Sequence, residues 1–145
     1  MPRVDTMLLV GKLHPLLVHF PIALVLVAAG AELAAMRTLR ASWRAIAVFN
    51  LQAAAVMAVA TVIAGSLLAL APFVDGTPSL TLHRWAGVAA AAATVGAAVA
   101  SRKRHLETTR MLTVYRSALF GAAALMAIAG HLGAALVWGP DFLTR

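Results

Sequence analysis

The sequence predicts an all-α integral membrane protein, a four-helix up-down bundle with both termini on the extracytoplasmic side. Three observations support this fold class: the composition, four long apolar runs, and basic residues gathered in two of the connections. Of 145 residues, 62% are hydrophobic and 12% are charged, whereas a soluble domain carries about 25% charged residues. The mean hydropathy of +0.89 agrees. The chain therefore lacks the polar surface of a water-soluble domain.

The length predicts a single domain, residues 1–145. The absence of cysteine excludes disulfides, thiolate-ligated zinc, iron–sulfur clusters and c-type haem attachment. In a soluble chain the formal charge of +7 would suggest nucleic acid. Here the cations fall in short connections, where they set topology, so we expect no nucleic-acid binding. Lys12, Pro15 and Pro21 interrupt the first apolar run, so we interpret it as a retained helix and not a cleaved signal.

Four runs approach the roughly 20 apolar residues that a helix needs to cross a bilayer, namely residues 14–36, 45–71, 82–100 and 112–138. In the first run, Pro21 removes a hydrogen bond to Leu17 and predicts a kink just past His19. Pro72 ends the second run. The alanines of the third run predict close helix packing. The fourth run ends before Pro140, and the short connections make consecutive helices antiparallel neighbours.

The basic residues predict the orientation. Eight cations lie in or beside the connections that join the first run to the second and the third to the fourth: Arg37, Arg40, Arg44, Arg102, Lys103, Arg104, Arg110 and Arg116. The other side carries four: Arg3, Lys12, Arg84 and Arg145. The positive-inside rule places the eight-cation side in the cytoplasm. We therefore predict a multi-pass protein of the bacterial inner membrane with periplasmic termini.

Four of the five histidines cluster near the predicted outer face: His14, His19, His83 and His131. Counting at 1.5 Å per residue places His19 and His131 at a shared depth of roughly 8–10 Å. His14 and His83 come out closer to the surface, so the count predicts a buried pair and a shallower pair. His105 falls in the basic cytoplasmic connection, where a solvated histidine needs no further explanation.

A single histidine in a membrane bundle can simply hydrogen-bond across helices. Four from three helices indicate a bound group, because polar residues in the membrane are costly and imidazole is a common metal ligand. Without carboxylate or thiolate nearby, they suit haem iron, copper or zinc. We favour haem b, with His19 and His131 as axial ligands and Arg84 beside the propionates. Arg84 could equally be a snorkelling interfacial cation.

The main alternative is a copper or zinc site formed by the same four histidines. His14 and His19 lie about 140° apart on a helix, so they face one centre only if the chain at Pro15 is not yet helical. Glu32 lies inside the first run, where it is either a proton-relay residue or the partner of Arg116 or Arg44. Two amides of the second run, Asn50 and Gln52, are interpreted as interhelical hydrogen-bonding groups.

Three segments resemble the bacterial membrane family called domain of unknown function 2231: residues 13–24 (LHPLLVHFPIAL), 83–87 (HRWAG) and 130–137 (GHLGAALV). Glu32 and Ala134 depart from that pattern, where we expect Asp and Gly. The resemblance implies a small polytopic protein, often encoded beside or fused to cytochrome-type respiratory modules. It carries over no catalytic residues, but it favours a redox role.

These expectations combine into a membrane b-type cytochrome, an electron-transfer module or respiratory-complex subunit and not a stand-alone enzyme. Its partners would be the lipid bilayer, other membrane or periplasmic redox proteins, or further copies of the chain. Electrons would pass between quinol or a partner cofactor and an extracytoplasmic acceptor. The alternatives are a non-haem copper or zinc protein and a structural subunit without cofactor.

Overall fold

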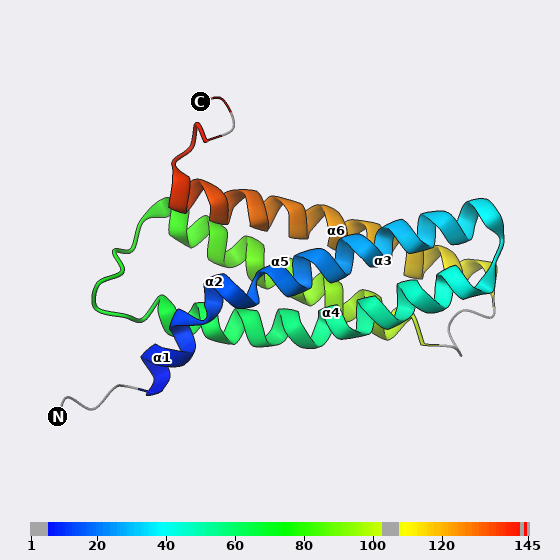
Figure 1. Ribbon diagram of the computed structural model, residues 1–145, viewed down its shortest axis with the longest axis horizontal. Coiled ribbons are helices and arrows are strands. Elements are labelled where there is room, and N and C mark those ends of the chain that lie inside the picture. The colour runs from blue at the N-terminus through cyan, green and yellow to red at the C-terminus, as the bar shows by residue number, and fades with distance from the viewer. Residues whose placement is uncertain (1–5, 103–107, 143, 145) are drawn as a thin grey trace.

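The computed structural model describes residues 6–102, 108–142 and 144. Its secondary structure in those residues is entirely helical (Figure 1). The helices are α1 (Thr6–Lys12), α2 (His14–Leu17), α3 (His19–Thr38), α4 (Ala41–Leu68), α5 (Pro78–Ala100) and α6 (Thr109–Trp138). The predicted all-α fold class is confirmed.

The four long helices, α3 to α6, form a closed bundle. Each packs against the next along the chain, and α3 also packs against α6. Figure 1 shows them running side by side, with α1, the connection from α4 to α5 and the end of α6 at one end of the bundle. The turn from α3 to α4 lies at the other end. This is the predicted up-down bundle, and its orientation in the membrane stays a prediction.

Among the described residues, three helical stretches are long and apolar enough to cross a membrane: Thr6–Thr38, Ala41–Leu68 and Thr109–Trp138. The fourth predicted span, residues 82–100, corresponds to α5, which is not among these three stretches. This helix is 23 residues long, roughly 35 Å at 1.5 Å per residue. However, it begins with polar residues that include His83 and Arg84, and alanine dominates the rest. Alanine offers less apolar surface than leucine or valine, so α5 depends more on packing against α4 and α6.

The N-terminal helical stretch is interrupted at Val18, between α2 and α3. Pro21 has no N–H to donate to the carbonyl of Leu17, which explains an interruption just before it. Val18 keeps helical dihedral angles (φ −60°, ψ −28°), so the kink predicted just past His19 stays a prediction. At the start of the stretch, α1 packs closely on the end of α4. A Cβ at Gly11 would lie 2.7 Å from the backbone nitrogen of Leu68.

Small residues dominate the core. One cluster contains Val25, Ala54 and Ala90, and another contains Leu51 and Tyr115. Alanines let the helix backbones approach, which confirms the packing role predicted for the alanines of α5. Large apolar side chains instead point outward: Phe49, Val56, Leu70 and Val137 are each at least 70% exposed. Such an inside-out distribution suits a protein whose surroundings are lipid.

Candidate functional site

His14 lies in α2 and reaches across to α4. Its Nδ1 is 3.0 Å from the backbone carbonyl oxygen of Thr61. Four residues further along α4, Gly65 presents no side chain to the ring. A Cβ there would lie 2.8 Å from Nδ1 and from Cε1 of His14. The missing methyl group therefore lets the imidazole reach a carbonyl that helix neighbours normally cover.

His83 repeats this arrangement on the other side of the bundle. It lies in α5, and its Nδ1 is 3.2 Å from the carbonyl oxygen of Ala129 in α6. Gly133 follows Ala129 by four residues, and a Cβ there would lie 2.9 Å from Cε1 of His83. Each histidine is thus held by a carbonyl at one helix position and by a glycine one turn later.

The two imidazoles face each other. Their ring centroids are 6.3 Å apart and their planes meet at 70°. A carbonyl oxygen can only accept a hydrogen bond, so each Nδ1 carries the proton in the neutral ring. Each Nε2 is then left with a free lone pair. That is the tautomer of a metal-ligating histidine, whose other nitrogen typically donates to a carbonyl or carboxylate.

His19 and His131 take the opposite position, because both are exposed on the outside of the bundle. The ring of His131 lies against Phe142, with centroids 5.4 Å apart. The sequence predicted these two as the buried pair and His14 with His83 as the shallower one, and the structure reverses that burial. Counting along a helix measures depth in the bilayer, whereas burial depends on which face of the helix packs.

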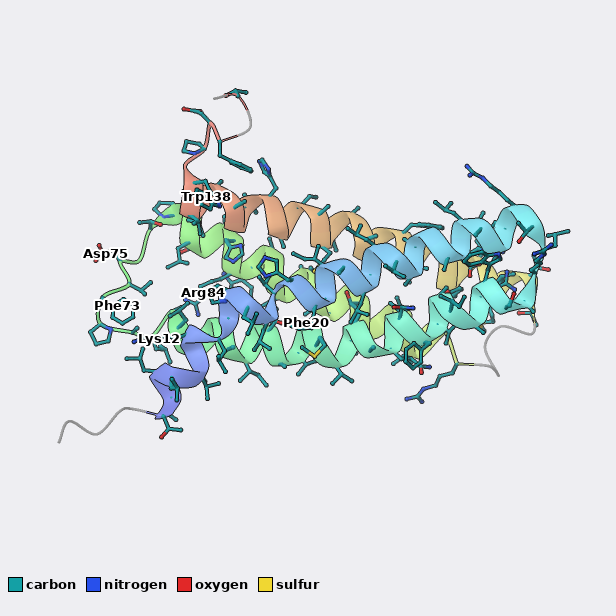
Figure 2. The ribbon with its side chains drawn as sticks, viewed as in Figure 1. Lys12, Phe20, Phe73, Asp75, Arg84 and Trp138 are labelled. Atoms are coloured by element: carbon teal, nitrogen blue, oxygen red, sulfur yellow. The ribbon has the colours of Figure 1, made fainter. Side chains whose placement is uncertain are left out.

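The four-histidine arrangement expected for copper or zinc is not assembled. Within residues 6–102, 108–142 and 144, no three His, Asp or Glu side chains converge on a point that could hold a metal ion. His14 and His19 point different ways, as expected when both are helical. Arg84 is exposed. Figure 2 shows Arg84, Lys12 and Asp75 at the same end of the bundle.

A second polar cluster joins three helices near the turn from α3 to α4. Glu32 is fully buried, and its carboxylate accepts hydrogen bonds from Arg44, Arg116 and Tyr115. The shortest contacts to Glu32 are 2.9 Å from Arg116 and 3.3 Å from Arg44. The expected ion pair of Glu32 is confirmed, and it includes both named arginines.

The backbone positions that hold the two histidines could not be predicted from the sequence: Thr61, Gly65, Ala129 and Gly133. A carbonyl acceptor leaves no residue-type signal, and these glycines resemble other small packing residues. The amide of Asn50 bonds to Ile46 of its own helix, so its interhelical role is wrong. His105 and its neighbours Lys103 and Arg104 lie outside the described residues, as do Arg3 and Arg145.

Comparison with known proteins identifies the family. The family model described as "Predicted membrane protein (DUF2231)" matches residues 11–142, nearly the whole chain. Comparisons with curated proteins and with solved structures find no match. The chain belongs to the DUF2231 family of membrane proteins.

Proposed function

We propose that this member of the DUF2231 family is a membrane electron-transfer subunit in which His14 and His83 would hold a b-type haem. One observation carries the proposal: two half-buried imidazoles from different helices face each other, each with Nδ1 bonded to a carbonyl and Nε2 free. The proposal keeps the cofactor class expected from the sequence and changes the ligand pair from His19 and His131 to His14 and His83.

The donor set favours haem over zinc. Structural zinc takes four protein ligands and catalytic zinc three, and no such group converges in the described part of the chain. A porphyrin supplies four ligands itself, so two axial histidines suffice. The ring centroids of His14 and His83 are 6.3 Å apart, so both imidazoles would be within reach of one bound group.

Neighbouring residues suit this role. Hydrogen bonds to the carbonyls of Thr61 and Ala129 orient the two rings and make each Nε2 a more basic metal ligand. Arg84 and Lys12 lie at the same end of the bundle (Figure 2), where their charges would balance propionates. A bound haem supplies a one-electron couple. The protein's own contribution is to hold the two ligands and to surround them with apolar helices.

A structural role is the second candidate, and the same hydrogen bonds favour it. His14 ties α2 to α4, and His83 ties α5 to α6. Histidines that bond across helices stabilise membrane bundles without any cofactor. The two functions differ in what they require, because a structural tie uses Nδ1 alone whereas ligation also needs Nε2.

Asparagine separates these functions, because its amide nitrogen occupies nearly the position of Nδ1 and nothing replaces Nε2. The test uses wild type, His14→Asn and His83→Asn purified in mild detergent from haem-supplied bacteria. Reduced-minus-oxidised spectra and metal analysis are recorded for each. We expect a sharp α-band in the wild type and its loss, or a change of axial ligation, in both variants. His19→Asn and His131→Asn should retain the wild-type spectrum.

Other outcomes contradict the proposal in distinct ways. Loss of the haem spectrum only in His19→Asn and His131→Asn would show that His19 and His131 are the ligands, as first expected from the sequence. Stoichiometric copper without a Soret band would show that the bound group is copper and not haem. The structural role would be established if the wild type contained neither haem nor copper. In that case the asparagine variants should keep the thermal stability of the wild type, and His14→Ala and His83→Ala should lose it.

A further inference from the structure

A groove runs along the outer face of α4, at the end of the bundle that carries Glu32. It has a volume of about 390 Å³ and a mainly apolar lining. The lining comes from one face of α4 and from the residue that caps α5: Ala41, Arg44, Ala45, Val48, Phe49, Gln52 and Ser101. The α4 positions recur every three or four residues, so they form a strip along the helix. The strip is roughly 16 Å long at 1.5 Å per residue.

Arg44 places positive charge at one end of this strip. Its Nε and Nη2 donate to Glu32, and its Nη1 makes no such contact. The Arg44 side chain is 29% exposed, so the cluster covers it only in part. Two arginines share the single carboxylate of Glu32, which leaves one positive charge uncompensated in the cluster. The groove therefore combines an apolar wall with an anion-attracting end.

Gln52 adds a polar group further along the same wall. Its side chain is exposed, and no hydrogen bond joins it to another residue in the part of the chain that the structure describes. At 1.5 Å per residue, Gln52 lies roughly 12 Å further along α4 than Arg44. The groove is therefore polar near both ends and apolar between them, at Ala45, Val48 and Phe49.

We infer that this groove binds one anionic phospholipid, with the phosphate at Arg44 and an acyl chain along Ala45, Val48 and Phe49. Charge complementarity selects this occupant, because basic pockets between membrane helices bind anionic headgroups. The strip runs along the helix, as an acyl chain does in a bilayer. This site lies at the opposite end of the bundle from His14 and His83, so it does not depend on haem binding.

Native mass spectrometry of the full chain in mild detergent tests the site, with dioleoyl phosphatidylglycerol and dioleoyl phosphatidylcholine as probes. Ala45→Trp fills the groove without touching the arginine. Ile46→Trp is the matched control on α4, because Ile46 is 42% exposed, lies about 100° round the helix from Ala45 and does not line the groove. We expect the wild type to bind one phosphatidylglycerol about five times more tightly than phosphatidylcholine, as one favourable cationic contact predicts.

Ala45→Trp should lose that preference, and Ile46→Trp should keep it. Equal affinity for the two lipids in the wild type would overturn the inference, as would an unchanged preference in Ala45→Trp. A lipid-free dimer that Ala45→Trp dissociates would assign the groove to a second copy of the chain and also overturn it.

Discussion

At the residue scale, the same small device holds both facing histidines. A helix carbonyl is already bonded to the N–H four residues later, and the side chain of that later residue normally shields it. Where that residue is glycine, a ring from another helix can approach and make a second bond. Gly65 opens the carbonyl of Thr61, and Gly133 opens that of Ala129.

Gly133→Ala tests this device. The new Cβ would lie 2.9 Å from Cε1 of His83, so the ring or the helix must move. We expect a loss of about 1–3 kcal/mol in the free energy of unfolding, as for other overpacked sites. The haem spectrum should be lost or altered at the same time. Stability is measured by SDS titration of the helical circular dichroism in detergent micelles.

Gly121→Ala is the control on the same helix, because a Cβ there meets nothing within 4 Å. It should be neutral or stabilise the protein by up to about 1 kcal/mol, since alanine is the better helix former. Equal effects of the two substitutions would show that the space beside His83 is unimportant.

At the element scale, Glu32 connects helices that are distant in sequence. Its carboxylate on α3 accepts hydrogen bonds from Arg44 on α4 and from Tyr115 and Arg116 on α6. The carboxylate is fully buried, whereas the arginine side chains stay 27–29% exposed. Breaking a buried pair leaves charges without their partner, which costs more than the intact pair contributes. The cluster therefore specifies how α3, α4 and α6 meet at this end.

Glu32→Gln should lower the free energy of unfolding by about 2–4 kcal/mol, because two arginines then lack a counter-charge. The lower part of that range allows for the partial exposure of both arginines. Arg37→Ala, which removes an exposed cation from the same helix, should change it by no more than about 0.5 kcal/mol. SDS titration in micelles compares the two. A change below about 1 kcal/mol for Glu32→Gln would mean that the cluster is not a structural joint.

At the scale of the whole molecule, the two polar clusters occupy opposite ends of an apolar bundle. The His14–His83 pair lies at the end that carries α1 and the connection from α4 to α5, and the Glu32 cluster lies near the turn from α3 to α4. The cations Arg37, Arg40 and Arg102 belong to the Glu32 end. The positive-inside rule therefore predicts that the histidine pair faces the periplasm.

A topology reporter checks this orientation in cells. A periplasm-active enzyme fused after Arg145 should be active, and the same enzyme inserted after Leu39, in the turn between α3 and α4, should be silent. The reverse pattern would place the histidine pair in the cytoplasmic half. Activity at both positions would contradict the crossing of the membrane by α4, α5 and α6.

Much of the fold was predictable because it depends on composition and on chain length between breaks. Helix number, the break near Pro21 and the end of α6 all follow from local chemistry. Helix α5 is not among the three stretches apolar enough to span a membrane, since its alanines are individually weak and His83 and Arg84 lie near its start. The partners of Glu32 were predictable because few cations lie at its level.

The sequence by itself determined that this is a helical membrane protein with histidines toward one end and arginines toward the other. Only the tertiary structure decided which histidines meet. His14 and His83 face each other because glycines on two other helices give their rings access to backbone carbonyls. His19 and His131, at a similar height, turn outward. Depth follows from position along one helix, whereas the direction of a side chain depends on how the helices pack.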